Sequence, residues 1–309
     1  MSDAGEAVRR HRALLSGQYE KHQKKREELR AGAEKLQFAW IKGHEKLYKF
    51  KSMSGESRDH VLDIIIHSRI YFSSPKEFND PLDCAPICSL ARPLTDEFIC
   101  ELLDDETDLA REAAKSAEEV EALPRAEGVP PDRIAAAVTD RIRAELVNNA
   151  RVFCLSASEV HPLLWSHYAD SHRGICLHFR ASPGSLFGLA RAVDYRGERP
   201  SILIPLKYNK SEDEITDAMV RVKGDFWGYE DEYRIIGNEG ADVEWGATVV
   251  DRLCPFPPEF LCGITLGMNT SPQDRKDLMM LAAEHYPEMA VYQAAEATDR
   301  FGVDIFRIR

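Results

Sequence analysis

Two glutamates, Glu230 and Glu232, stand one residue apart in the aromatic-rich stretch Phe226–Ile236. Alternate side chains of an extended segment lie on one face, so the spacing predicts two neighbouring carboxylates. Paired carboxylates beside aromatic rings are typical of sites that tune acid–base or electrostatic chemistry. The alternative is a pair of surface carboxylates that form salt bridges with Arg234 or Arg173.

A second polar and aromatic segment runs from an expected strand into an expected helix. Ser156 and Ser158 follow the strand, where hydroxyl groups can bind a ribose or a backbone carbonyl. Trp165, His167 and Tyr168 follow on the helix, and such rings can stack on a flat ligand. Alternatively, Trp165 and Tyr168 form one packed helix face with His167 at its rim.

A third segment contains Phe78-Asn-Asp-Pro. Asn or Asp before Pro favours a turn, which here is either part of a site or a structural turn in which Asn79 and Asp80 bond nearby backbone. Phosphate-binding glycine loops, His-Glu-x-x-His and Gly-x-Ser-x-Gly do not occur. Cys84 and Cys88 form one lone pair without a second pair, so we expect no metal site there.

The elements that must position these residues are short strands separated by helices of modest length. β-Branched and aromatic runs predict strands, and apolar residues at helical spacing predict helices. The class is α+β, a compact mixed-sheet core without strict alternation of strand and helix. We expect strands at 46–50, 69–72, 151–156, 174–179, 193–195, 202–204, 232–236, 261–266, 290–293 and 303–308, and helices at 57–68, 162–170, 211–222 and 271–285.

The net charge of −12 is unevenly distributed over the 309 residues. Residues 1–46 hold 11 Lys and Arg against seven Asp and Glu, whereas Asp96–Glu121 holds 11 acids and two bases. We therefore expect a basic helical arm at 1–45, open to a protein partner or self-association, and one α+β domain at 46–309 with a helical insertion at about 96–149. The acidic total argues against a surface that coats nucleic acid.

No apolar run is long enough for a membrane span, and no secretory signal is evident. Seven scattered cysteines are typical of reduced thiols, so we expect a cytoplasmic protein that does not contact a membrane.

Six ordered motifs resemble a widespread bacterial family, the domain of unknown function 2971, over about residues 46–309. The motifs are Leu47-Tyr-Lys-Phe, Tyr71-Phe-Ser-Ser-Pro, Phe78-Asn-Asp-Pro, Leu164-Trp-Ser-His-Tyr-Ala, Gly174-Ile-Cys-Leu and Trp227-x-Tyr-Glu-x-Glu-Tyr-Arg. This resemblance implies no activity by itself.

The order of the parts also resembles ADP-ribosyltransferases of the diphtheria/cholera-toxin type, and that resemblance implies their fold. In that family a first strand carries a basic residue, a later strand ends in Ser-x-Ser or precedes a Tyr-bearing helix, and a last strand opens with a catalytic Glu. Here those positions are matched by Lys49 or Lys51, by Ser156-Ala-Ser158 with Tyr168, and by Glu230-x-Glu232. Lys departs from the Arg or His of those toxins, because it lacks the bidentate fork of Arg.

The resemblance implies NAD as a substrate and a role for each matched residue. Glu232 would bind the nicotinamide ribose and stabilise the positive charge that develops as nicotinamide leaves, and Glu230 would orient or deprotonate the acceptor. Ser156 and Ser158 would hold the ribose or the nicotinamide edge. Tyr168 or Trp165, near His167, would stack on nicotinamide. The pyrophosphate would pair with Lys49, Lys51 or Arg173.

The sequence thus favours an NAD-consuming ADP-ribosyltransferase or NAD glycohydrolase, acting on a macromolecular acceptor of unknown identity as a bacterial toxin or phage-defence effector. One alternative is a metal-dependent nuclease-like effector that uses Asp80, Asp83, Glu230 and Glu232. Another is a non-enzymatic protein-binding module.

Overall fold

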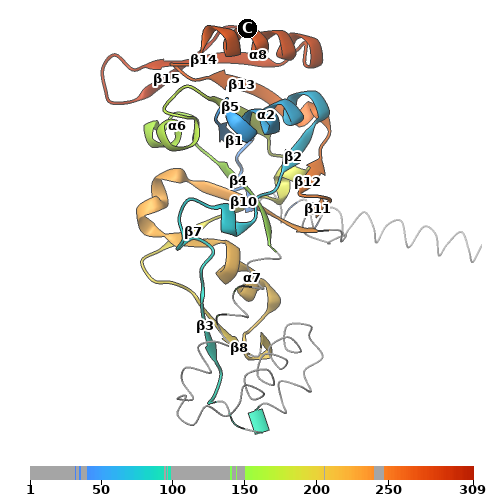
Figure 1. Ribbon diagram of the computed structural model, residues 1–309, viewed down its shortest axis with the longest axis vertical. Coiled ribbons are helices and arrows are strands. Elements are labelled where there is room, and N and C mark those ends of the chain that lie inside the picture. Colours follow the sequence, from blue (N-terminus) through green and yellow to red (C-terminus); the bar gives the residue numbers. More distant parts are fainter. Residues whose placement is uncertain are drawn as a thin grey trace, which may run out of the picture.

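A computed structural model describes residues 40–93, 150–204, 206–239 and 247–309, with isolated positions between 32 and 144. The expected arm at 1–45 and the expected insertion at 96–149 therefore lie almost wholly outside the described residues. The described part is elongated, with α8 (Pro272–His285) at one end and β3 (Ile87–Leu90) and β8 (Ser201–Ile204) toward the other (Figure 1). No described helix has the length and apolar character needed to span a membrane.

A mixed sheet of nine strands forms the centre of the described part, which confirms the α+β class. Neighbouring strands are antiparallel except for the pairs β10–β11 and β13–β14. The strand order is β11 (Ala247–Val249), β10 (Glu232–Glu239), β4 (Arg151–Ser156), β1 (Lys46–Lys51), β5 (Ile175–Arg180), β13 (Leu261–Leu266), β14 (Ala290–Glu296) and β15 (Val303–Arg307), and β6 (Arg191–Ala192) also pairs with β10.

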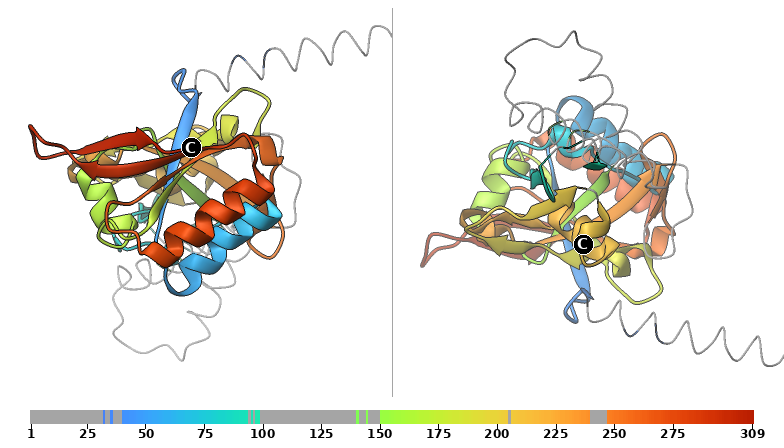
Figure 2. Two further views of the ribbon diagram at one scale, coloured as in Figure 1. Left: turned by 90° about the horizontal axis from the view of Figure 1, so that it is seen from above. Right: turned by 90° about the horizontal axis from the view of Figure 1, so that it is seen from below.

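Helices cover both faces of this sheet. α2 (Gly55–His67) lies beside α8, and the two pack on one face over a core that includes Leu47, Phe153 and Leu177 (Figure 2). The short helix α6 (Pro162–Tyr168) packs on the other face, where its Trp165 meets Phe50. Side chains of one strand alternate between these two cores, so the faces of β1 are unambiguous.

Smaller strand pairs extend the molecule away from the sheet. These are β2 (Arg69–Tyr71) with β12 (Leu253–Pro255), β3 with β8, and β7 (Asp194–Arg196) with β9 (Val222–Gly224). α7 (Glu212–Val220) precedes β9. The helix expected at 211–222 is therefore shorter than the acidic pattern indicated, because the chain turns into a strand at Val222.

Several other boundaries agree closely with the sequence. The strands at 151–156 and 261–266 have the expected ends, and α8 begins one residue after the expected start, where Ser271 accepts a hydrogen bond from the Asp274 amide. The helix expected at 162–170 ends at Tyr168 instead. Asp170, Ser171 and His172 all have positive φ, a left-handed turn that leads the chain into β5.

A fork between β1 and β4 shapes the middle of the sheet. The two strands pair only where Tyr48 faces Ser156. Near the start of β4, Val152 instead exchanges two backbone hydrogen bonds with Ser73. β1 and β4 therefore diverge, and the sheet opens between them.

Gly174 is tightly enclosed where the chain enters β5. A Cβ atom placed there would lie 2.1 Å from the Lys51 carbonyl oxygen, which is far inside van der Waals contact. We expect Gly174→Ala to lower the free energy of unfolding by about 1–3 kcal/mol in chemical denaturation. Gly228→Ala is the control, because no atom lies within 4 Å of its added Cβ. Equal midpoints for the two variants would contradict this packing.

Candidate functional site

A cavity of about 340 Å³ occupies the fork, within the size range of small-molecule sites. All three segments singled out in the sequence contribute to it, together with β1 and β9. Its lining residues are Tyr48, Lys49, Phe50, Ser73, Glu77, Phe78, Asn79, Asp83, Val152, Cys154, Leu155, Ser156, Leu164, His167, Tyr168, Lys223, Glu230, Glu232 and Arg234.

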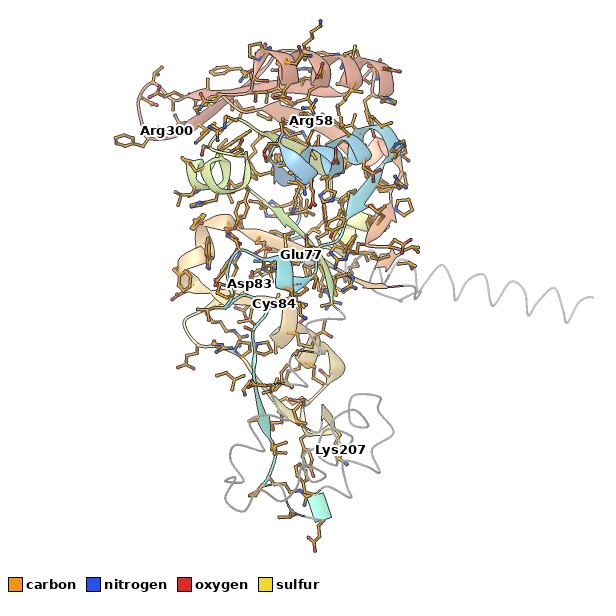
Figure 3. All side chains as sticks on the ribbon, viewed as in Figure 1. Arg58, Glu77, Asp83, Cys84, Lys207 and Arg300 are labelled. Carbon is orange, nitrogen blue, oxygen red and sulfur yellow. The ribbon has the colours of Figure 1, made fainter. Side chains whose placement is uncertain are left out.

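Arg234 anchors the deep end of the cavity and is completely buried. Its guanidinium donates to both oxygens of Asp83 (2.9 and 2.6 Å) and to both oxygens of Glu232 (2.8 and 2.9 Å). It also donates to the Val220 carbonyl at 2.8 Å. Arg234 thus joins β10, the loop before β3 and the end of α7. Asp83 and its neighbour Cys84 lie at mid-height of the molecule in Figure 3.

Lys223 connects the carboxylates of the cavity to one another. Its ammonium nitrogen lies 2.5 Å from Glu230 Oε2, 3.1 Å from Glu232 Oε2 and 3.5 Å from Asp83 Oδ2. Burial would lower the pKa of Lys223, but these three carboxylates outweigh burial and raise it above its ordinary value. Lys223 therefore stays charged.

The pKa values of the two glutamates are shifted in opposite directions. Burial would raise the pKa of Glu232, but the charges of Arg234 and Lys223 hold it well below its ordinary value. Burial raises the pKa of Glu230, which Lys223 only partly opposes. Glu232 is therefore a fixed anion, and Glu230 is the carboxylate that takes up a proton more readily.

Glu230 and Glu232 do converge, but not by strand alternation. Glu230 ends the 3₁₀ helix η4 (Asp225–Glu230), and Glu232 begins β10. Asp231 between them is left-handed, with φ 42°. This reversal, and not an extended segment, brings both carboxylates to Lys223.

The second segment divides between the cavity and the core. The Tyr168 hydroxyl donates to Glu230 Oε1 at 2.6 Å, and buried Ser156 donates to the Glu230 carbonyl at 2.6 Å. The Ser158 amide donates to Ser156 Oγ, while exposed His167 lines the cavity. Trp165 is fully buried and donates to the Glu159 carbonyl, so its indole is a core side chain that does not line the cavity.

The Phe78-Asn-Asp-Pro turn is both structural and part of the cavity wall. Asp80 accepts from the Leu82 amide at 2.8 Å, as expected for a turn, and also from the Trp227 indole at 2.7 Å. The second bond ties the turn to η4. Asn79 lines the cavity beside Tyr168.

The three basic residues expected at a pyrophosphate lie in different places. Lys49 lines the cavity, and its ammonium crosses the fork to the Cys154 carbonyl at 2.7 Å. Lys51 does not line the cavity; its register partner Ile175 belongs to the core under α2 and α8. Arg173 is exposed and pairs with Asp170.

Three functional features were missed from sequence. Lys223 follows an acidic helix and carries no motif of its own, and Asp83 was considered only as a metal ligand. Tyr48 faces the same side of the sheet as its register partner Ser156, whereas Lys49 projects from the opposite face of β1, although both line the cavity. The only sequence signal for Tyr48 was the alternation of apolar residues along β1.

Three of the four carboxylates of the nuclease alternative are already paired with cations, and the fourth accepts a hydrogen bond from a neutral indole. Asp83 and Glu232 bind Arg234, Glu230 binds Lys223, and Asp80 accepts from Trp227. Within the described residues, no group of three or more His, Cys, Asp or Glu side chains could hold a metal ion.

Fold and site define an α+β protein with a cavity built around buried ion pairs. Residues 164–235, which contain most of α6, all of β5 and α7, and both glutamates, match the family described as "Protein of unknown function (DUF2971)". Neither the curated proteins nor the solved structures contain a match to the chain.

Removal of Arg234 tests the buried network. Arg234→Met leaves Asp83 and Glu232 short of a counter-charge, and we expect the free energy of unfolding to fall by about 3–5 kcal/mol. Arg173→Met removes an arginine from an exposed pair and should leave the denaturation midpoint unchanged. Similar midpoints for both variants would show that Arg234 does not organise the site.

Lys51 gives the protein a pH-dependent stability. Burial lowers the pKa of Lys51 to about 7 from 10.5, so the unfolded chain binds more protons between those values and stability rises with pH across that window. We expect Lys51→Met to remove this rise of stability with pH and to be more stable than the parent at the low-pH end of the window. Denaturation midpoints at about pH 6 and about pH 9 measure both effects. Lys46→Met, an exposed position of the same strand, should keep the parent profile. An unchanged pH slope in Lys51→Met would contradict the assignment.

Proposed function

We propose that the protein consumes NAD, as an ADP-ribosyltransferase or an NAD glycohydrolase. The observation that carries the proposal is that Glu232, Ser156 and Lys49, from the neighbouring strands β10, β4 and β1, line one cavity with Tyr168. These are the parts that the resemblance to ADP-ribosyltransferases requires, in the order that it requires. The match to a family of unknown function neither supports nor opposes this activity.

The charges of the cavity suit cleavage of the bond between nicotinamide and ribose. Nicotinamide leaves with the bonding electron pair, and positive charge develops at the ribose carbon. Glu232, held as an anion, stabilises that charge, since a fixed carboxylate needs no reorganisation. Glu230 accepts the proton of the attacking acceptor or water, a role that fits its raised pKa.

The remaining contacts divide along the cavity. Tyr168 is the ring that faces nicotinamide, since Trp165 is enclosed in the core. Ser156 holds the ribose side, and Ser158, which does not line the cavity, positions the Ser156 hydroxyl through its amide. Lys49 contributes the positive charge for phosphate. In a bacterial cytoplasm, where the free cysteines of the described part would stay reduced, such an activity would serve a toxin or phage-defence effector.

The test is nicotinamide release from NAD by the purified full chain, alone and with candidate acceptors, followed by tracing of labelled ADP-ribose. We expect turnover by the parent and a loss of about 100-fold or more in Glu230→Gln and in Glu232→Gln. Arg173→Met changes an exposed residue that does not line the cavity and should keep the parent rate. No release under any acceptor condition would refute the proposal, and a nucleic-acid cleavage that EDTA abolishes would favour the nuclease alternative.

A further inference from the structure

The ion pairs of the cavity do not balance. Three buried carboxylates, Asp83, Glu230 and Glu232, share two buried cations, Lys223 and Arg234. The side chains of all five are at most 6% exposed, so water cannot neutralise the difference cheaply. The cluster therefore carries one excess negative charge when every group is ionised.

The excess charge falls on Glu230. Asp83 and Glu232 each receive two bonds from Arg234, whereas Glu230 receives one from Lys223 and one from the neutral hydroxyl of Tyr168. Lys49 also lines the cavity, but it forms no ion pair with these three carboxylates: its ammonium donates to the Cys154 carbonyl and lies over the Phe153 ring. Glu230 lines the cavity, so a ligand can reach the place where the positive charge is missing.

The walls near this carboxylate are aromatic. Tyr48, Phe50, Phe78 and Tyr168 line the cavity, and Tyr168 is directly bonded to Glu230. Aromatic faces attract cations through their quadrupole, most strongly where water is excluded. A cavity with aromatic walls and one unbalanced buried carboxylate suits a flat organic cation better than a neutral ring of the same shape.

We infer that the cavity selects a flat organic cation, such as a pyridinium ring, and that the cation enters with loss of a proton from Glu230. The inference rests on the proposed function for the choice of pyridinium, which is the oxidised nicotinamide ring of NAD. The exchange is balanced: the protonated carboxyl gives its proton to solvent, and the carboxylate that remains pairs with the bound cation.

The proton exchange makes binding dependent on pH. As pH rises, a smaller fraction of Glu230 is protonated in the free protein, and the affinity of the cavity for the cation increases. The titratable and charged groups around Glu230 come from several elements. They are Lys223 of β9, Glu232 and Arg234 of β10, Tyr168 and His167 of α6, Tyr195 of β7, Asp83 of the loop before β3, Tyr229 of η4, Lys49 of β1 and Glu77 of η1 (Pro75–Glu77).

Calorimetry with two small probes tests the inference without turnover. The probes are nicotinamide, which is neutral, and the ring-methylated nicotinamide cation, which has nearly the same shape and a permanent charge. We expect the full chain to bind the cation at least about tenfold more tightly. Its binding heat should differ between buffers of different ionisation enthalpy by the amount that proton release predicts, and the neutral probe should show no such difference.

Two variants locate the effect. Glu230→Gln should remove both the preference for the cation and the proton release. Asp231→Asn is the matched control, because Asp231 is exposed, Asn tolerates its left-handed backbone, and the same unit of charge is removed one residue away. Circular dichroism checks that each variant is folded. If Glu230→Gln does not fold, the comparison of buffers with the parent chain still decides.

Equal affinity for the two probes, absence of binding, or a preference that persists in folded Glu230→Gln would overturn the inference. Failure of the proposed function has a different signature. Selective binding of the cation without nicotinamide release from NAD would leave the inference standing and would refute NAD consumption.

Discussion

The guanidinium of Arg234 is the constraint on which the rest of the described structure depends. A buried guanidinium loses its hydration, so nearby anions and hydrogen-bond acceptors must compensate its charge. Those of Arg234 come from three separate parts of the chain. Asp83 comes from the loop before β3, Glu232 from the same strand, and the Val220 carbonyl from the end of α7. The pairs β3–β8 and β7–β9 are thereby attached to the main sheet at the point where the cavity forms.

The cavity itself results from a sheet that does not close. β4 leaves β1 after one residue pair, and its first residues find backbone partners at Ser73 instead. The Cys154 carbonyl then lacks a strand partner, and the Lys49 ammonium supplies the missing donor. An unpaired buried carbonyl would be costly, so the lysine stabilises the opening as well as lining it. The cavity thus results from the course of the backbone, and the side chains of the fork only line it.

Local patterns were enough to locate most strands and helices, because burial on one face leaves a periodic signal in the sequence. They also identified the segments that meet at the cavity. They could not reveal Lys223, which follows the expected helix and carries no motif, nor the role of Asp83, which depends on an arginine 151 residues away. The register of β1 against β4 was equally hidden, so Lys49 could be proposed for the site but Tyr48 could not. Trp165 shows the converse, since an aromatic residue beside a site in sequence can still belong to the core.

One backbone reversal separates the tasks of the two glutamates. If Asp231 were extended, Glu230 and Glu232 would project from one strand into the same surroundings and compete for the same cations. The left-handed Asp231 ends η4 instead, so Glu230 reaches the cavity from the 3₁₀ helix and Glu232 from the sheet. Of the two glutamates, Arg234 then binds Glu232 alone, and Tyr168 binds Glu230 alone. The two carboxylates share Lys223 but differ in every other side-chain partner. Burial therefore raises the pKa of Glu230, whereas the paired cations lower the pKa of Glu232. A difference of chemistry between identical side chains thus arises from a single residue whose own side chain lies in solvent.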